Sequence, residues 1–526
     1  MFRLSSYAIL LALIPCMQTS IPALAARENT FDVTAYGAVG DGSADDTPAI
    51  QQAINAAKAA AGGTVYFPAR TYLLNSHYPS SHPWFFYNLL VGSNVTLSGQ
   101  PGAKLLQGPK GRHALLPRAT EVRNTVLAVG PDYATVRFQS TAHNGGFYAL
   151  RPTKADTATV TFARFQDAAH FAHGDYVAIY ARATGDVIPT ETSQVVSVDV
   201  ATGVLALKTT LARSFATPLL AKVTALATTN VAIKNLVVQG TEPLAVSEIF
   251  GFTAENNQFL IDCSVGGGNV TGLNLNTLNG FRFSGNLITC VGPSFSILEL
   301  AQRNSQNGCF EGNTIQVRQT GMGEYAARWK FTKNRFTLHP DKHTTAGLFI
   351  GGLDIEFRDN RVEGGNLTGG GGFGSLIADY SAPDDYAPYV GKIRIVDNTV
   401  SCQADGNACL GLFAQDTVVM GNTIEVKGSG VGIHAEGPLP QSLTIRNNRL
   451  AMGSGNGMVI VTPLCDGSTI SGNTLSGSAG AVGIFVASPR APNRGGHTIS
   501  QNTIRGFATH VSIDPAKHPG TVLADN

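Results

Sequence analysis

The feature that most constrains the fold is a six-residue phrase that recurs along the second half of the chain. It reads apolar, any, any, Asn, any, apolar, as in residues 283–288 and 310–315. The copies centre on Asn286, Asn313, Asn334, Asn360, Asn398, Asn422, Asn448, Asn473 and Asn502. Successive asparagines are 21 to 38 residues apart. A repeat of this length is typical of a solenoid, in which each repeat stacks on the next.

The content of each repeat indicates strands. Short β-branched runs and abundant glycine fill the repeats, and no helical period is present. Asparagine suits a tight turn because it tolerates left-handed backbone angles, and stacked asparagines can bond to each other in a ladder. We therefore predict an all-β parallel β-helix over residues 229–510, followed by a tail, 511–526, that lacks the repeat. Unrelated Asn turns in a glycine-rich β-protein would not keep apolar residues at fixed offsets.

Composition and charge fit one long domain. The chain has 526 residues, 43% of them apolar, so it can bury a large core. Only 14% are charged and the net charge is +1, which gives no reason to expect a nucleic acid or an anionic membrane as partner.

Residues 1–25 have the pattern of an export signal. Arg3 supplies the positive start, residues 8–14 the apolar stretch, and residues 23–25 the small-x-small cleavage site. A lipoprotein cysteine at Cys16 is the alternative, although Pro15 is an awkward neighbour. No segment has the length of a membrane span, so we expect a secreted or periplasmic protein.

The cysteines indicate a disulfide rather than a metal site. Six remain after cleavage, namely Cys263, Cys290, Cys309, Cys402, Cys409 and Cys465. An exported protein can form disulfides, and Cys402 and Cys409 are the predicted pair because they bracket a short glycine-containing loop. Buried free thiols are the alternative for each cysteine. No zinc-type spacing is present, and no metal is expected.

Residues 26–110 are predicted to contain a cap helix that covers the first end of the solenoid, together with the first coils. Asp46 or Thr47 is the N-cap of a helix with Pro48 in its first turn. The apolar face of this helix consists of Ile50, Ala53, Ile54 and Ala57. Gly62 and Gly63 end it, and a strand follows at residues 64–68. Because an open solenoid end exposes core and strand edges, this segment is assigned to capping rather than to catalysis.

The segment from Phe31 to Ala57, followed by residues 62–74, closely resembles the N-terminal signature of the pectate-lyase-superfamily β-helix proteins. These include the family 28 glycoside hydrolases and phage tailspikes. The resemblance implies a right-handed parallel β-helix and, most often, action on polysaccharides. It does not specify the reaction, since hydrolases, lyases, epimerases and binding proteins share the signature.

Residues 111–228 lack the asparagine repeat and are predicted to be a β-rich insertion. Residues 174–180 resemble a strand, and residues 194–207 resemble a hairpin around Gly203. Two roles are open for the insertion: it walls one side of a substrate cleft, or it mediates association.

A second strand precedes the asparagine phrase in each coil, and its period of two predicts which residues face outward. The inward set is Phe252, Leu273, Leu376, Leu412 and Ile433. One outward row holds Thr253, Asn274, Ile377, Phe413 and His434, and the next holds Glu255, Asn276, Asp379, Gln415 and Glu436. Glu299 is expected on the same face, and Arg328 between these coils.

These rows supply the candidate site. The candidate catalytic residues are Glu255, Glu299, Arg328, Asp379, His434 and Glu436, and the candidate substrate-binding residues are Asn274, Asn276, Trp329 and Tyr380. Glycoside hydrolysis needs two carboxyl groups roughly 5–9.5 Å apart. β-Elimination from a uronate needs a base and a group that neutralises the sugar carboxylate. Solvated surface charge is the plainer interpretation of any single residue.

The chain departs from the catalytic patterns of the resembled families. The Asn-Thr-Asp, Asp-Asp, Gly-His-Gly and Arg-Ile-Lys stations of family 28 are absent, and so is the Asp-Pro-His-Asp station of alginate epimerases. His339 and His343 stand beside a proline in a predicted surface loop. No cofactor is expected, although a Ca²⁺ site among carboxylates is conceivable. We expect an exported protein that cleaves a uronate-containing glycan by hydrolysis or elimination; the alternative is a glycan-binding or tailspike-like attachment solenoid.

Overall fold

A computed structural model describes most of the chain. The described residues are 29–80, 85–113, 123–130, 146–181, 190–263, 271–292, 297–302, 304–317, 319–322, 326–339, 347–350, 352–366, 376–378, 391–403, 408–412, 416–435, 443–461, 467–487 and 496–526. The predicted export signal lies outside them. No helix in these ranges is long and apolar enough to cross a membrane.

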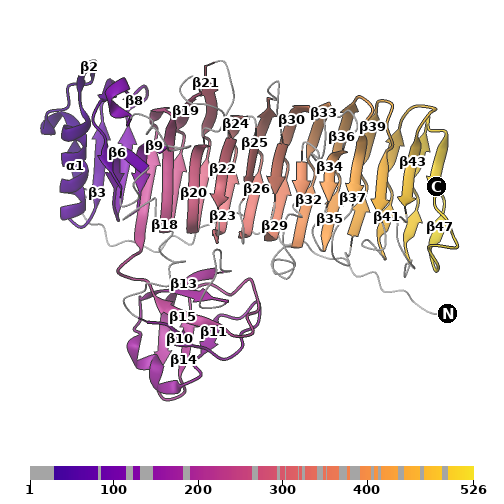
Figure 1. The fold of residues 1–526 in the computed structure, drawn as a ribbon, viewed down its shortest axis with the longest axis horizontal. Helices are drawn as coiled ribbons and strands as arrows, with labels where there is room; N and C mark the ends of the chain where they lie inside the picture. The colour runs from indigo at the N-terminus through magenta and orange to yellow at the C-terminus, as the bar shows by residue number, and fades with distance from the viewer. Residues whose placement is uncertain are drawn as a thin grey trace, which may run out of the picture.

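The chain winds into a parallel β-helix, as predicted (Figure 1). Each coil contributes strands to three faces. The first face contains β6 (Phe85–Val91), β9 (Arg123–Val129), the first halves of β18 (Glu242–Glu255) and β20 (Thr271–Ser284), β22 (Ile297–Gln302), β25 (Gln319–Met322), β28 (Gly347–Ile350), β31 (Leu376–Ala378), β34 (Ala408–Leu412), β37 (Val431–Ala435), β40 (Met458–Val461), β43 (Val482–Ala487) and β46 (Thr509–Ser512). The short β5 (Tyr78–Pro79) pairs antiparallel with β6.

The second face follows in each coil, because β18 and β20 run round the corner between the two. It contains β1 (Thr30–Asp32), β3 (Gly63–Phe67), β7 (Val95–Gly99), β16 (Thr228–Lys234), the second halves of β18 and β20, β23 (Gln306–Glu311), β26 (Ala327–Thr332), β29 (Leu353–Arg358), β32 (Gly391–Val396), β35 (Thr417–Met420), β38 (Leu443–Arg446), β41 (Thr469–Ser471), β44 (Thr498–Ser500) and β47 (Val522–Ala524).

The third face completes each coil. It contains β2 (Asp41–Asp45), β4 (Thr71–Leu74), β8 (Lys104–Gln107), β17 (Val237–Gly240), β19 (Gln258–Asp262), β21 (Leu287–Val291), β24 (Thr314–Val317), β27 (Arg335–Leu338), β30 (Arg361–Asn366), β33 (Thr399–Gln403), β36 (Thr423–Lys427), β39 (Arg449–Met452), β42 (Thr474–Ser476) and β45 (Thr503–Arg505).

The asparagines form a ladder at the turn between the second and third faces. Asn313 shows the pattern: its Oδ1 accepts from the main-chain N–H and the Nδ2 of Asn286, at 3.0 Å each. Its Nδ2 donates to Phe283 O and to Asn334 Oδ1. The ladder asparagines are buried, and the left-handed residue is the one before each of them, such as Lys333 before Asn334. The turn therefore needs two residues: one for the backbone bend and one for the ladder.

The ladder extends beyond the predicted copies at both ends. Asn257 begins it, donating its N–H to Asn286 Oδ1. At the other end Asn526 Oδ1 accepts from Asn502 Nδ2, and β46 and β47 add strands to the first two faces. The prediction of a tail over 511–526 outside the coils is therefore wrong. Residues 523–526 match the first four of the six positions of the phrase.

One apolar core runs the length of the solenoid. Phe283, Phe310 and Phe331 stack on successive coils, with ring centroids 4.9 and 5.2 Å apart. Gly308 lies beneath this stack, where an added Cβ would stand 1.9 Å from Phe281 Cζ. The missing side chain makes room for the rings of Phe281 and Trp329, whose centroids are 4.6 Å apart.

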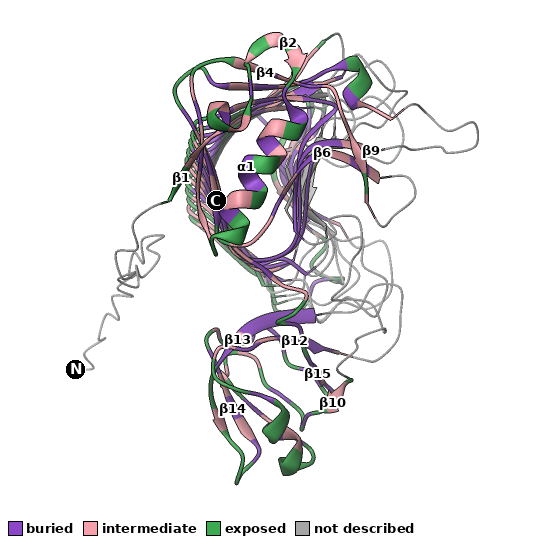
Figure 2. Cartoon of the chain, turned by 90° about the vertical axis from the view of Figure 1, so that its left-hand side faces the viewer, coloured by how far each residue is buried: buried purple, intermediate pink, exposed green. Residues whose placement is uncertain are grey.

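The first end of the core is covered by α1 (Thr47–Ala59), as the view along the axis in Figure 2 shows. The short 3-10 helix η1 (Val33–Tyr36) packs against α1. The predicted apolar face is buried throughout, and Asp46 is the N-cap with Pro48 in the first turn. The side chain of Asp46 accepts from the N–H groups of Val39 and Gly40 instead of from the helix. Asp45 takes the capping role, accepting from the N–H of Thr47.

The insertion is a six-stranded antiparallel barrel that lies beside the solenoid (Figures 1 and 2). It contains β10 (Tyr148–Ala149), β11 (Thr159–Thr161), η4 (Phe165–His170), β12 (Tyr176–Tyr180), β13 (Thr190–Asp199), β14 (Val204–Leu207) and β15 (Leu219–Lys222). A bridge between Leu150 and Phe162 joins the strands at its two edges.

The insertion starts later than predicted. β9 pairs with β6 and β18, so the chain up to Val129 still belongs to the first face. This strand carries no asparagine phrase, and sequence periodicity alone did not distinguish it from the insertion. The solenoid resumes at β16, on the second face, so the insertion leaves from the corner between these faces.

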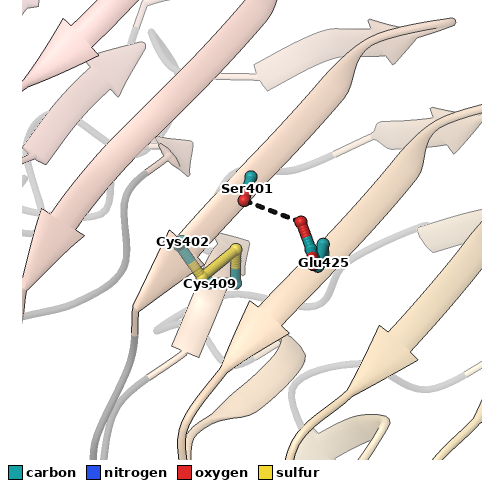
Figure 3. Close-up of a disulfide and its surroundings, with 4 residues drawn as sticks. All are labelled: Ser401, Cys402, Cys409 and Glu425. Carbon is teal, nitrogen blue, oxygen red and sulfur yellow. Dashed lines mark hydrogen bonds between the residues drawn. A yellow bond between two sulfur atoms is a disulfide. The ribbon is translucent and has the colours of Figure 1, made fainter.

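The predicted cysteine pair lies at another corner. Cys402 is the next-to-last residue of β33 on the third face, and Cys409 is the second residue of β34 on the first face. Their sulfurs are bonded, with the Cα atoms 5.9 Å apart (Figure 3). Beside them Ser401 Oγ donates to Glu425 on the next coil at 3.0 Å. Cys263 and Cys309 are buried thiols.

Candidate functional site

Strand register places one row of positions along the whole first face. In coil order it holds Leu90, Ala128, Ala245, Asn274, Glu299, Gly321, Phe349, Ile377, Gly411, His434, Val459 and Phe485. We call this the Asn274 row. Asn274, Ile377 and His434 thus share a row, as predicted. Glu299, which was predicted only to lie on the same face, belongs to this row as well. Glu299 and His434 are five coils apart, roughly 24 Å, which is too far for one catalytic centre.

Two predicted members of these rows stand elsewhere. Thr253 and Glu255 pair in register with Arg282 and Ser284, which puts them on the second face. Glu255 there forms an ion pair with Lys234 at 3.4 Å. The prediction failed because a strand that rounds a corner keeps its period of two but changes the face to which it belongs.

Arg328 lies at the corner where the insertion meets the solenoid. Its guanidinium donates to the carbonyl oxygens of Thr210 and Leu211 and pairs with Asp156 at 3.2 Å. All three partners belong to the insertion. The structure therefore gives Arg328 a role in fastening the insertion and does not bring it to Glu299.

Trp329 is not available to stack on a sugar. Its side chain is fully buried, with its ring 5.7 Å from that of Phe310. Its Nε1 donates to Ser305 O at 3.1 Å. The prediction that Trp329 binds substrate is wrong, because Trp329 has the same inward parity as Phe331 two residues later. Asp379, Tyr380 and Glu436, like Phe413 and Gln415, lie outside the described residues.

Polar side chains meet on the first face at β18 and β20. Ser247 and Asn276 are register partners on neighbouring coils, and Asn274 precedes Asn276 on the same side of its strand. Asn276 Nδ2 donates to Asn274 Oδ1 at 2.8 Å. All three side chains are buried. We call these three residues the amide cluster; the next position in the Asn274 row is Glu299.

An aromatic group that the sequence reasoning missed lies at the N-terminal end of the row. Phe85, Tyr87 and Leu90 pack against the buried Ala128 and Ala245. The rings of Tyr78 and Tyr87 are 6.0 Å apart, and the guanidinium of Arg123 lies 5.3 Å from the ring centre of Phe85. The sequence did contain a signal for this group, because residues 78–87 are rich in aromatic side chains. Small residues also stand in the same row on the two preceding coils, with Ala128 two coils and Ala245 one coil before Asn274.

The insertion is fixed along the corner beside the amide cluster. The carbonyl of Thr192 accepts from Asn279 Nδ2 at 2.7 Å, three residues after Asn276. The N–H of Thr190 donates to Asn304 Oδ1, and Arg213 Nη2 donates to Ala326 O. These contacts span three successive coils, so the insertion is a firm neighbour of this part of the first face.

Buried charges flank the cluster on both sides. Burial raises the pKa of Glu242 while the adjacent Arg123 guanidinium lowers it, and the net direction is upward. Glu191 in the insertion has the same balance of burial against Arg213, with a separation of 3.5 Å. Burial also raises the pKa of Tyr180 well above its ordinary value. The Glu242–Arg123 pair joins β18 to β9, and the Glu191–Arg213 pair lies within the insertion, so each of these carboxylates already has a cationic partner.

Comparison with known proteins agrees with the N-terminal resemblance. Residues 30–109 match a family described as rhamnogalacturonase A/epimerase, pectate lyase-like. Mannuronan C5-epimerase AlgE3 of Azotobacter vinelandii is 64% identical over 70 residues, which are 13% of this chain and 4% of that protein. Alginate lyase 7 of the same bacterium is 44% identical over 69 residues, 13% of this chain and 8% of that protein. The similarity in sequence thus spans a small part of these relatives.

The fold is similar to that of phage tailspikes. The tailspike gp61 of Pseudomonas phage phi297 superposes with a TM-score of 0.51 at 12% identity, over 95% of this chain and 82% of that one. The Gp54 tailspike of Acinetobacter baumannii phage AP22, solved with a capsular saccharide, gives 0.51 at 9% identity, over 94% and 79%. At these identities the likeness concerns the fold, and it confirms the predicted parallel β-helix.

Proposed function

We propose that this protein is an exported enzyme whose first face binds a uronate-containing polysaccharide and cleaves it by β-elimination. The observation that carries the proposal is the order of groups along the first face: aromatic rings, then the amide cluster, then Glu299 on the next coil. Rings offer apolar faces for sugar stacking, amides and hydroxyls offer hydrogen bonds, and the carboxylate offers a base. Residues 30–109 and the epimerase and lyase matches support a uronate substrate.

Elimination is preferred over hydrolysis because of the spacing of carboxylates. Hydrolysis needs a second carboxyl group roughly 5–9.5 Å from the first. On the first face, the described strands adjoining β22, namely the first half of β20 and β25, carry no Asp or Glu. Elimination needs one base, for which we propose Glu299, and a group that neutralises the sugar carboxylate.

The test is an assay of the purified chain on polygalacturonate, alginate and a neutral glucan. New absorbance from unsaturated uronate is expected on an acidic polymer. Glu299→Gln should lower kcat about 10² to 10⁴-fold, as the loss of a general base does. Glu255→Gln is the matched control on the second face and should leave kcat unchanged. New reducing ends without this absorbance would show that the reaction is hydrolysis and not elimination. The absence of product on every polymer would contradict the proposal that the protein is an enzyme.

A second candidate is a non-catalytic solenoid that holds a glycan. It is favoured by the composition of the Asn274 row, in which Glu299 and His434 are the only titratable positions of the twelve named. Binding of an acidic polymer by the unmodified chain without turnover would select this function.

Mass spectrometry of the exported protein tests the predicted export signal, since cleavage after Ala25 gives a mature chain that begins at Ala26.

A further inference from the structure

We infer that the amide cluster is a subsite for the free hydroxyl groups of a sugar ring, and that the protein therefore discriminates against a polymer O-acetylated at those hydroxyls. The inference rests on the proposed function, because it assumes that a polysaccharide lies along the first face. It adds the chemistry that this part of the face recognises, namely hydroxyl donors rather than carboxylates or cations.

The first argument is that two polar atoms of the cluster are buried without a partner. Ser247 Oγ and Asn276 Oδ1 make no hydrogen bond, although Ser247 is 1% and Asn276 8% exposed. A buried polar atom that loses water without gaining a partner destabilises a protein, so such atoms are rare. Here two occur on register-paired residues of neighbouring coils, on the same face as Glu299. A ligand that supplies the missing bonds accounts for both.

The second argument is that the hydrogen bond between the two asparagines determines which atom of each amide is left to bind a ligand. Asn276 Nδ2 is engaged with Asn274 Oδ1 at 2.8 Å, so Asn276 presents its oxygen and Asn274 its Nδ2. Asn276 Oδ1 can only accept, Asn274 Nδ2 can only donate, and Ser247 Oγ can do both. A hydroxyl group is the sugar substituent that satisfies either kind of partner.

The third argument excludes the other ligand classes. A carboxylate at Asn276 Oδ1 would place two acceptors against each other. A Ca²⁺ ion prefers several carboxylate oxygens, and the cluster offers only neutral ones. An acetyl ester removes the hydroxyl proton that Asn276 Oδ1 needs and adds bulk at a buried site.

The experiment compares binding of two probes by the full chain: polygalacturonate or alginate, each unmodified and chemically O-acetylated. The unmodified chain should bind the acetylated form at least about tenfold more weakly, the loss expected from one unpaired buried group. In Ser247→Ala and Asn276→Leu, affinity for the unmodified polymer should fall about tenfold and the difference between the two polymer forms should shrink.

Ser284→Ala is the matched control. Ser284 Oγ is likewise buried without a partner, but Ser284 belongs to the second face. Ser247→Ala and Ser284→Ala should both keep or raise the Tm, since each removes an unsatisfied hydroxyl, and only Ser247→Ala should weaken binding. If the unmodified chain binds a polymer but neither cluster variant changes affinity, the subsite is overturned while the proposed function stands. If the chain binds no polymer, both are overturned.

Discussion

At the scale of single residues, the ladder asparagines join features that a turn residue rarely combines. From Asn286 to Asn502, each is buried, accepts two hydrogen bonds from the coil before it, and donates to a main-chain carbonyl and to the coil after it, as Asn313 does. A buried amide in such a chain stabilises because all its groups are paired, and one lost member leaves several unpaired.

Asn313→Leu should therefore lower the free energy of unfolding by about 4 kcal/mol, because it leaves the N–H and Nδ2 of Asn286 and the carbonyl of Phe283 without partners. Urea denaturation measures the change. The same substitution at Asn526, which is exposed at the last coil, is the control and should cost clearly less. Equal losses at both positions would contradict the ladder as a buried network.

Gly308 is a second residue whose role follows from local packing. Gly308→Ala places a methyl group where Phe281 Cζ is 1.9 Å away, so the rings must shift and the protein should lose about 1 to 3 kcal/mol. Gly480→Ala is the control, because an added Cβ there meets nothing within 4 Å. Thermal melts that compare the Tm of each variant with that of the unmodified chain test this prediction. An unchanged Tm for Gly308→Ala would contradict it and would show that the Phe281 ring moves aside at no cost.

At the scale of elements, the N-terminal cap depends on Asp45. Its carboxylate accepts from the N–H and Oγ1 of Thr47, the N–H of Asn75 and Ser76 Oγ. Burial alone would raise the pKa of Asp45, but the hydrogen bonds from Ser76, Thr47 and Asn75 together hold it below its ordinary value of 3.8. Asp45 thus fastens the start of α1 to the strand end of β4.

A lowered pKa in the folded state means that Asp45 stabilises the fold above its ordinary pKa and loses this effect as pH falls through the folded value. Asp45→Asn should therefore lower the Tm at about pH 6, and the difference from the unmodified chain should shrink at about pH 3. Asp41→Asn serves as comparison, because Asp41 bonds only within its own loop. A Tm difference for Asp45→Asn that is constant with pH would rule out the ionised cap.

At the scale of the whole molecule, the insertion and the solenoid are joined along one corner, and this junction borders the proposed subsite. Arg328 supplies three of the contacts, and Arg213, Thr190 and Thr192 supply others. The first face is therefore flanked by a separate barrel at the coils that carry the amide cluster.

Arg328→Ala should loosen this junction. We expect amide hydrogen exchange in β13 and β15 to rise severalfold while exchange in β33 to β39 stays unchanged. Arg335→Ala is the control, since Arg335 pairs with Glu363 on the third face. If Arg328→Ala abolishes polysaccharide cleavage with no change in exchange, the residue is catalytic after all and its structural assignment fails.

The sequence by itself determined the coil, the cap and the cysteine pair, because each is encoded within a short stretch: a repeated turn with its amide, a helix with its apolar stripe, two thiols flanking one loop. Only the tertiary structure decided which outward residues are neighbours. The period of two along a strand predicts whether a side chain points into the core or out of it. It does not predict which of the three outer faces of the coil an outward side chain lies on. Left-handed residues at the corners, such as Glu248 and Thr277, bend the strand between faces and cannot be recognised from the pattern. Hence Glu255 left the candidate site, and Ser247 joined Asn274 and Asn276 in it.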